Sequence, residues 1–398
     1  MKMKIVKLDT LVWFQEGPGV RNTQYTKKGV KLINVTNLVD GLLDLSLTSR
    51  YISEEEAYGK YKHFLCDEGD LVIASSGITY DSIPNKVSFI RKSDLPLCMN
   101  TSVIRFKSLD SKKVNIKYLY YFFKSNCFRN QISKLMTGSA QLNFGPSHLH
   151  KVFIPICEKE KQDHIVESLD NLYLAANSIS KEVSLFDELI RTRFIEMFGT
   201  IDLFEEKNEC QTMESVSSIC TGTTPSTTDA ANWDGDILWI TPAEMNSETF
   251  FVYDTERKIT EQGKKSKSLD LMPEGTVLLS TRAPIGKVGI VGKPMCCNQG
   301  FKNFVCSKSI NPVYLYVLLK NNTEYLNSLG SGTTFLEVSK SKIEKMKIPV
   351  PKIDLQNSFS DFVISSNEAK KQSKKKAAQI DNLINKYLEE YYPVYEEE

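Results

Sequence analysis

Side chains that can form several hydrogen bonds are concentrated in a few predicted loops of this sequence. Residues 221–228 read TGTTPSTT, a turn segment dense in hydroxyl groups, and residues 280–287 read STRAPIGK. Arg, Asn, Gln, Ser and Thr side chains can read the edges of bases, and Lys can contact phosphates. The pattern is compatible with nucleic-acid recognition, although composition alone favours an ordinary polar loop surface.

The candidate DNA-contacting residues come from matching loops in the two halves of the chain. In the second half they are Thr223, Thr224, Ser226, Arg282, Lys287, Asn298, Gln299 and Lys302. In the first half they are Arg21, Asn22, Gln24, Tyr25, Ser75, Ser76, Thr79 and Tyr80. The span 257–302 holds nine Lys or Arg against three Asp or Glu. Since local charge matters more than the net charge, this excess favours a polyanionic partner.

No catalytic or metal-binding constellation is recognisable in the sequence. GSGTT at 330–334 lacks the lysine of a P-loop, and neither GxSxG nor HExxH occurs. INPVY at 310–314 faintly resembles an NPPY motif, but Pro312 is typical of a first helical turn. His148 and His150 have no nearby carboxylate or cysteine to complete a metal site. We therefore expect no catalytic residue, no metal and no cofactor in this chain.

Length and composition are those of an ordinary globular protein. The chain has 398 residues, 41% hydrophobic and 25% charged, with a formal net charge of +1, which suits two or three domains. No stretch approaches the roughly 18 apolar residues that span a bilayer, and no signal-peptide pattern follows the start. The nine cysteines include no C-x-x-C pair, so we expect reduced, mostly buried thiols. These features predict a cytoplasmic protein without membrane contact.

The strongest signal in the sequence is an internal repeat with an offset that drifts from 206 to 194 residues. The apolar pair Leu32-Ile33 is matched with Leu238-Trp239 near its start. The longer matched segments keep their order; they are GDLVIASS (69–76) with GTVLLSTR (275–282), NIKYLYYFFK (115–124) with NPVYLYVLLK (311–320), TGSAQLNF (137–144) with SGTTFLEV (331–338), and KVFIPI (151–156) with KMKIPV (345–350). A period this long indicates a duplicated domain, because solenoid repeats are far shorter.

A long helix is predicted after each repeat. The first runs from about residue 159 to 197 and carries a heptad seam at Ile165, Leu169, Leu172, Ala176, Ile179, Val183, Phe186 and Ile190. The second runs from about 355 to 391, and its polar middle, KKQSKKK at 370–376, is either a solvated face or a phosphate contact. Because one exposed apolar stripe is unstable in water, we expect the two helices to pack antiparallel, with a pseudo-twofold relation between the repeats.

Together these segments resemble the specificity subunits of type I restriction–modification enzymes. The resemblance is carried by GTTPSTTDAANWDGDILWI at 222–240, by LLSTRAPIGKVGIV at 278–291 and by the two IP motifs with their helices. The stretch IPICEKEKQDHIVESLD at 154–170, continuing to RFIEMFG at 193–199, is similar to the central spacer of that family. The resemblance covers essentially the whole chain. The first half departs from it at 16–24, where EGPGVRNTQ lacks the TPS of the corresponding loop.

The resemblance implies an α+β fold. Two similar α/β target-recognition domains are expected, separated by two long antiparallel coiled-coil helices in a pseudo-twofold internal duplication. The implied division places recognition domains at 1–157 and 200–351, spacer helices at 158–199 and 352–392, and an acidic tail at 393–398.

The resemblance also implies a division of labour. Each recognition domain would read one half of a bipartite, asymmetric target in double-stranded DNA. The paired helices would set the unread spacer and dock two modification (methyltransferase) subunits, and restriction subunits would join them. S-adenosylmethionine, ATP and Mg are expected on those partners. Two alternatives remain, a duplicated protein-interaction scaffold without DNA specificity and the specificity chain of a different restriction–methylation system.

Overall fold

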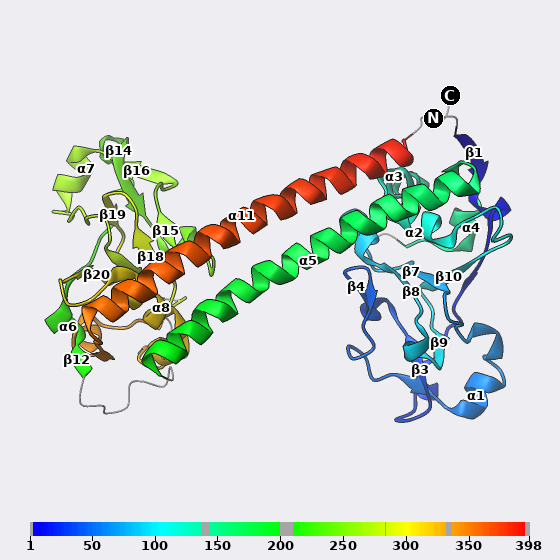
Figure 1. The fold of residues 1–398 in the computed structure, drawn as a ribbon, viewed down its shortest axis with the longest axis horizontal. Helices are drawn as coiled ribbons and strands as arrows, with labels where there is room; N and C mark the ends of the chain where they lie inside the picture. Colours follow the sequence, from blue (N-terminus) through cyan, green and yellow to red (C-terminus); the bar gives the residue numbers. More distant parts are fainter. Residues whose placement is uncertain (1–2, 137–142, 200–209, 283, 332–335, 395–398) are drawn as a thin grey trace. The chain divides into compact units, whose positions relative to one another are not determined.

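The computed structural model describes residues 3–136, 143–199, 210–282, 284–331 and 336–394. The chain divides into two compact units, unit 1 (Met1–Ser180 with Lys375–Glu398) and unit 2 (Lys181–Lys374). Each of two long helices contributes one end to each unit (Figure 1). Parts of the predicted segments lie outside the described residues, namely 137–142 and 332–335 of one repeat pair, 200–209, residue 283 of STRAPIGK, and 395–398 of the acidic tail.

Unit 1 contains a four-stranded antiparallel sheet and a smaller sheet beside it. The strands of the first are, in order, β2 (Val12–Glu16), β10 (Val103–Ser108), β7 (Leu71–Ala74) and β8 (Val87–Phe89). Those of the second are β6 (Tyr51–Ile52), β3 (Val30–Ile33) and β9 (Leu97–Met99). The remaining elements are β1 (Lys4–Lys7), β4 (Leu38–Val39), β5 (Leu42–Leu43), β11 (Phe153–Ile156), α1 (Glu54–Tyr58), α2 (Ile116–Lys124), α3 (Asn126–Leu135) and α4 (Pro146–Leu149). All four side chains of β7 are buried, as its continuous apolar run predicts.

Unit 2 repeats this arrangement with one additional strand in the larger sheet. That sheet has the order β13 (Ser217–Cys220), β20 (Asn303–Cys306), β17 (Val277–Leu279), β18 (Val288–Val291) and β15 (Phe251–Val252). The smaller sheet has β16 (Arg257–Ile259), β14 (Trp233–Ile240) and β19 (Met295–Cys297). The remaining elements are β12 (Cys210–Thr212), β21 (Lys347–Pro349), α6 (Met213–Val216), α7 (Glu261–Ser266), α8 (Pro312–Asn321), α9 (Thr323–Ser328) and α10 (Lys340–Glu344).

The strand registers confirm the duplication and correct one predicted match by a single residue. In unit 1, Ile33 pairs with Met99 in parallel register. In unit 2 the corresponding partner, Cys297, pairs with Ile240 rather than with Trp239. The match of Leu32-Ile33 is therefore with Trp239-Ile240. The extra residue enters where β14 shifts register between Trp233 and Ile237, an irregularity of the kind a β-bulge produces.

The junction between the globular part and its long helix is built with the same bonds in both units. The fully buried Gln162 accepts from the backbone N–H of Asn115 at 3.0 Å, and Gln356 accepts from that of Asn311 at 2.8 Å. Both glutamine amides also donate to two backbone carbonyls. Tyr118 donates its hydroxyl proton to the Pro155 carbonyl, and Tyr314 donates to that of Pro349. These satisfied buried groups fix where each long helix begins.

The first long helix, α5 (Lys159–Phe198), starts and ends within one residue of its predicted bounds. Every residue of the predicted heptad seam is buried or half-buried, from Ile165 at one end to Ile190 at the other. In unit 1 the start of the helix packs into the same core as Ile384 and Leu388 of the second long helix. The heptad pattern therefore identified the buried face of α5 correctly.

The second long helix, α11 (Ile353–Tyr391), keeps a heptad seam through its polar middle. Phe359 and Val363 are buried, and Ser366, Lys370 and Ser373 continue the same seam as buried residues. In unit 2, Phe359 lies against Phe194 of α5, with ring centroids 5.5 Å apart, whereas Ser373 donates to Glu182 at 2.9 Å. The later residue of α11, Ser373, thus contacts the earlier residue of α5, Glu182, so the two helices run antiparallel.

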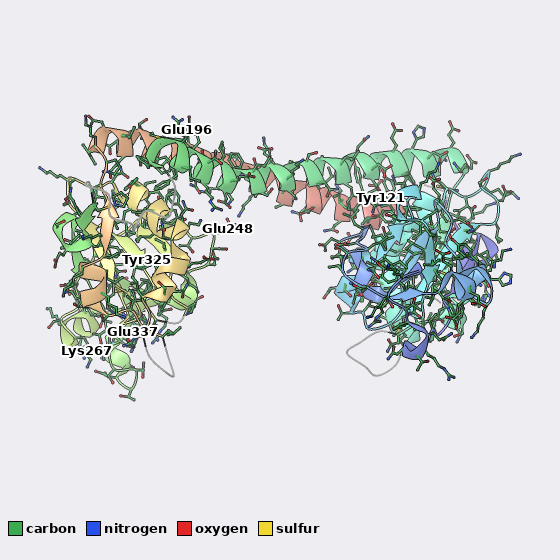
Figure 2. The ribbon with its side chains drawn as sticks, turned by 90° about the horizontal axis from the view of Figure 1, so that it is seen from below. Tyr121, Glu196, Glu248, Lys267, Tyr325 and Glu337 are labelled. Carbon is green, nitrogen blue, oxygen red and sulfur yellow. The ribbon has the colours of Figure 1, made fainter. Side chains whose placement is uncertain are left out.

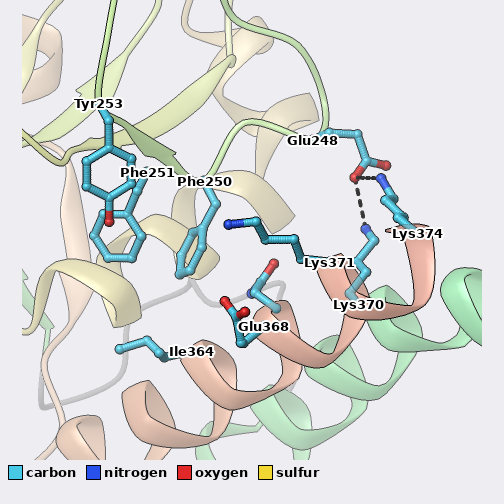
Figure 3. Close-up of a pocket in the computed structure, with 10 residues that line it drawn as sticks. Glu248, Phe250, Phe251, Tyr253, Ile364, Glu368, Lys370, Lys371 and Lys374 are labelled. Carbon is cyan, nitrogen blue, oxygen red and sulfur yellow. Dashed lines mark hydrogen bonds and ion pairs between the residues drawn. The ribbon is translucent and has the colours of Figure 1, made fainter. Parts of the chain in front are cut away.

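The buried Lys370 differs from the other lysines of the polar middle at 370–376, which are exposed. Its ammonium donates to Asp187 of α5 at 2.7 Å. It also lies 3.1 Å from Glu248, which accepts from Lys374 at 2.6 Å (Figure 3). Burial lowers the pKa of Lys370, but the hydrogen bonds to Asp187 and Glu248 outweigh it and leave the pKa raised. The bonds from Lys374 and Lys370 lower the pKa of Glu248 to about 2. Lys370 is thus neither solvated nor free for a phosphate, while Lys371 is exposed.

The described part of the chain also bears on membrane helices, metal sites, two histidines and the cysteines. None of its helices combines the length and the hydropathy of a bilayer-crossing segment. No group of three or more His, Cys, Asp or Glu side chains among these residues is arranged to hold a metal ion. His148 accepts from the Gly145 N–H, and His150 lies 2.8 Å from Asp9. The nine cysteines are free, and burial raises the pKa of Cys297 to about 12.

Candidate nucleic-acid interface

Four predicted contact residues of unit 2 meet around one pocket of about 310 Å³. Arg282, Lys287, Asn298 and Gln299 line it, together with the backbone and side chains of the segment 241–243. Thr224 joins them, because its hydroxyl donates to Gln299 Oε1 at 2.8 Å. The segments around Thr241, Arg282 and Asn298 therefore line a single concavity, and Thr224 is connected to it through Gln299.

A carboxylate that the sequence reasoning missed organises the cations beside this pocket. Glu337 lies 3.0 Å from Arg282 Nε and 3.4 Å from Lys302 Nζ. Arg282 is half-exposed, but Lys302 is buried and its ammonium also lies 3.5 Å from the Thr281 hydroxyl. Figure 2 shows Glu337 on the side of unit 2 opposite to Glu196 of α5. In this structure Lys302 positions Glu337 from inside the domain, so the predicted phosphate contact does not fit it.

Lys287 has a structural bond in addition to its place in the pocket. Its ammonium donates to the Pro242 carbonyl at 2.7 Å. Lys86 occupies the equivalent position in unit 1. Its backbone carbonyl accepts from the Ala74 N–H, and the backbone carbonyl of Lys287 accepts in the same way from the Ser280 N–H. The Lys86 ammonium likewise donates to a backbone carbonyl, that of Leu38, at 2.6 Å. In both units this lysine therefore ties the larger sheet to the segment that follows β3 or β14 of the smaller sheet.

The TGTTPSTT loop is fixed through its backbone. The indole N–H of Trp233 donates to the Ser226 carbonyl at 3.0 Å, and that of Trp239 donates to the Thr223 carbonyl at 3.2 Å. Thr223 and Thr224 are half-buried, whereas Ser226 is exposed and shares a hydrogen bond with the Thr228 hydroxyl. The tryptophans engage only backbone carbonyls, so the hydroxyl groups of the loop bond to one another or to Gln299 rather than to the core.

The corresponding loop of unit 1 is held by side chains instead. Arg21 and Asn22 are exposed at the start of a single helical turn. Gln24 donates to Glu56 at 2.6 Å and to the Tyr61 hydroxyl at 3.0 Å. The Tyr25 hydroxyl accepts from Asn100 at 3.3 Å. Gln24 and Tyr25 therefore support the loop, and Arg21 and Asn22 remain its exposed polar ends.

The residues predicted after strand β7 have different environments. Ser75 is 1% exposed, its hydroxyl has no hydrogen-bond partner among the described residues, and its backbone belongs to the sheet. Ser76 is half-buried and Thr79 is exposed. Tyr80 donates to Asn130 at 2.6 Å beneath the guanidinium of Arg129. The burial of Ser75, which directly follows β7, leaves it no surface for a DNA contact in this structure.

A polar network in unit 1 was not singled out from the sequence. Asn100 donates to Asn34 at 2.9 Å, and Asn34 also accepts from Arg50 at 3.4 Å. The repeat gave a signal for Asn100, because it matches Asn298 of the unit 2 pocket. Nothing in the local sequence marked Asn34 or Arg50, which only strand pairing brings beside the loop.

Comparison with known proteins gives a consistent result. The model of the family described as "Type I restriction modification DNA specificity domain" matches residues 2–184 and 205–382. The MjaIX specificity subunit of Methanocaldococcus jannaschii is 38% identical over 171 residues, 42% of this chain and 39% of that protein. The putative MjaX specificity subunit of the same organism is 21% identical over 90% of this chain and 87% of that protein.

The MjaVIII specificity subunit of that organism is 28% identical over 42% of this chain and 40% of its own length. The matched region thus spans about two fifths of the length of MjaIX and of MjaVIII. Among solved structures, the S subunit of a type I restriction–modification system from M. genitalium superimposes with a TM-score of 0.60 at 15% identity. That match covers 99% of this chain and 97% of the other, and it shows the shared fold. The chain therefore belongs to the family of type I restriction–modification DNA specificity domains, and it contains that domain twice.

Proposed function

We propose that this chain is the non-catalytic DNA-reading subunit of a type I restriction–modification complex. The observation that carries the proposal is the convergence of Thr224, Arg282, Asn298 and Gln299 at one pocket of unit 2. Amide, hydroxyl and guanidinium groups held in fixed relation are the groups that discriminate base edges in the major groove. Exposed Arg21, Asn22 and Thr79 would serve the corresponding role in unit 1.

Each recognition domain would read one half of a bipartite target in double-stranded DNA. We assign these domains to residues 1–157 and 200–351, and the spacer helices to 158–199 and 352–392. The two reading loops are supported by different contacts, tryptophan indoles in unit 2 and the side chains of Gln24 and Asn100 in unit 1. Because loops built differently present different groups, the two half-sites should differ and the target should not be a palindrome.

The long helices would set the unread spacer and dock two modification subunits. Apolar side chains on them are exposed, among them Leu185 and Leu189 of α5, each 48% exposed. Exposed apolar residues gathered on one element favour a protein interface. Restriction subunits would join the same complex, and S-adenosylmethionine, ATP and Mg would be bound by the partner subunits. Changing Leu185 and Leu189 to Glu should abolish copurification of a modification subunit without unfolding the chain.

The experiment that tests the proposal is methylation mapping of the host genome with this gene present and deleted. A single asymmetric, bipartite adenine-methylation motif should vanish on deletion. The purified complex of chain and modification subunits should then bind a duplex carrying that motif in preference to a scrambled duplex at the same salt concentration. A chain that binds its partners but shows no sequence preference would be the duplicated interaction scaffold instead. A motif modified by a different class of partner would indicate another restriction–methylation system.

A further inference from the structure

Two exposed arginines occupy equivalent positions in the repeats. In unit 1 the backbone N–H of Leu32 donates to the Arg50 carbonyl, and in unit 2 Trp239 pairs with Arg257 across β14 and β16. Leu32 and Trp239 are themselves equivalent, because they pair with Cys98 and Cys296 in the two parallel strand pairs. The same residue type therefore stands at one place in two domains whose surroundings have diverged.

In unit 2 the guanidinium of Arg257 lies over the rings of two tryptophans. Its central carbon is 3.5 Å from the ring centroid of Trp233 and 5.4 Å from that of Trp239. The two indoles are packed edge to face, 5.1 Å apart. These are the indoles that hold the carbonyls of Ser226 and Thr223. Arg257 is consequently fixed at the border of the TGTTPSTT loop.

In unit 1 the guanidinium of Arg50 lies over the ring of Tyr25 at 5.5 Å. It also donates to Asn34 Oδ1, which places it in the network that holds the Tyr25 hydroxyl through Asn100. Tyr25 closes the loop that corresponds to TGTTPSTT. The aromatic residue beneath the guanidinium differs between the repeats, but in both an arginine lies over a ring beside the loop.

Neither arginine forms an ion pair with a carboxylate in the part of the chain that the structure describes. Arg282, the predicted reader, is by contrast paired with Glu337. Stacking on a ring fixes the plane of a guanidinium and leaves its five N–H donors at the edge, an arrangement suited to a pair of acceptor atoms. In DNA such pairs are O6 and N7 of guanine, or two phosphate oxygens.

We propose that Arg50 and Arg257 are a matched pair of DNA-contacting arginines, one for each recognition domain, each held ready by the aromatic ring at its reading loop. The proposal rests on the proposed DNA-reading function. It assigns a positively charged, planar contact to each half-site at the same place in the domain, although the half-sites themselves differ.

The test uses the full chain with its modification subunits and a library of random-sequence duplexes, from which the bound sequences are selected and counted. Arg257→Ala should weaken binding of the selected target by about 10- to 100-fold, and Arg50→Ala should act on the other half-site. If the acceptor is a guanine edge, one position of the corresponding half-site loses its preference, and Arg257→Lys behaves like alanine. If the acceptor is a phosphate, all sequences weaken together, the salt slope falls by about one, and Arg257→Lys retains part of the affinity.

The matched control is Arg193→Ala. Arg193 is a half-exposed arginine of α5 beside the Phe362 ring, and it is paired with Glu196 at 2.7 Å. Glu196 lies on the other side of unit 2 from Glu337 (Figure 2). Thermal unfolding of each variant should match that of the parent, because both proposed side chains are exposed. If the Arg50 and Arg257 variants bind as Arg193→Ala does, the inference is wrong while the proposed function stands. If the parent itself shows no sequence preference, the proposed function fails with it.

Discussion

The helix junctions and the reading loops of the two units have diverged to different extents. At the junctions, Gln162 and Gln356 make the same set of backbone hydrogen bonds, as do Tyr118 and Tyr314. At the loops, Trp233 and Trp239 hold the backbone of one unit, whereas in the other unit Gln24 and Asn100 hold the loop through the side chains of Glu56 and Tyr25.

The difference follows from burial. A buried glutamine that satisfies three backbone groups cannot be exchanged without leaving those groups unpaired, which is costly in a water-free interior. A surface loop can change its side chains as long as its backbone is held by some donor, because water satisfies what the protein does not. A duplicated domain can thus keep its attachment to the spacer helix while the group it presents to a ligand changes.

The largest expected effect is on the length of the spacer. One heptad inserted after Ser180 in α5 and another after Lys374 in α11 keep the antiparallel seam in register and lengthen both helices by about 10 Å. The complex should then methylate sites whose halves are unchanged and whose spacer is longer by about 3 base pairs, as read by methylation mapping. A heptad in α5 alone should misalign the seam and destabilise the chain. An unchanged spacer in the double insertion would show that the helices do not set it.

The junction comparison predicts equal losses of stability at equivalent residues. Gln162→Ala and Gln356→Ala each leave buried backbone groups without a partner, and each should lower the free energy of unfolding by about 3 kcal/mol. Denaturant titration of the full chain measures this. Gln372→Ala, at an exposed glutamine of α11, is the matched control and should stay within about 0.5 kcal/mol of the parent. Clearly unequal losses would show that the two junctions do not contribute equally to stability.

The loop comparison predicts an effect confined to one half-site. Arg282→Ala should weaken binding of the methylated target sequence by about 1–3 kcal/mol if Arg282 leaves Glu337 to contact a base. Preference should fall at one position of the half-site read by unit 2, measured by competition between duplexes. Arg191→Ala, at an exposed arginine of α5, should change nothing. A loss below a few tenths of a kcal/mol would mean that Arg282 contacts no base and only forms its ion pair with Glu337.

The smallest effect should come from Glu248, the carboxylate that holds Lys370 and Lys374. Its pKa is lowered to about 2 from an ordinary 4.5, so its contribution is fully present above about pH 4.5 and is lost as the pH falls towards 2. Because Glu248 is half-exposed, Glu248→Gln should cost at most about 1 kcal/mol at pH 7.

The gap in unfolding free energy between parent and Glu248→Gln should narrow as denaturant titrations move from pH 7 to pH 3, and it should close as the pH approaches 2. Glu368→Gln removes an exposed carboxylate of α11 that has no ion pair among the described residues, and it should show no such pH dependence. A gap of the same size at pH 7 and pH 3 would mean that the packing of the Glu248 side chain, rather than its charge, stabilises the unit.

The sequence by itself determined the duplication, the two long helices and the buried face of α5. Each of these depends on a pattern that the chain carries along its own length, the repeat offset or the alternation of apolar residues every three or four positions. It also placed Arg282, Lys287, Asn298 and Gln299 in loops, and they meet in one pocket. The exposed Arg21 and Asn22 were found in the same way.

Only the tertiary structure decided which polar side chains are available to a ligand. Ser75 and Lys302 were predicted in loops but are buried. Lys370 was predicted to be solvated or to contact a phosphate, but it is bonded to Asp187 and Glu248. Arg50 and Arg257 carried no local signal, since the rings that orient them come from other strands and loops. The identity of a polar residue in the sequence does not show whether its side chain is ion-paired, stacked on a ring or free. Its role depends on partners distant in sequence, and folding alone brings those partners together.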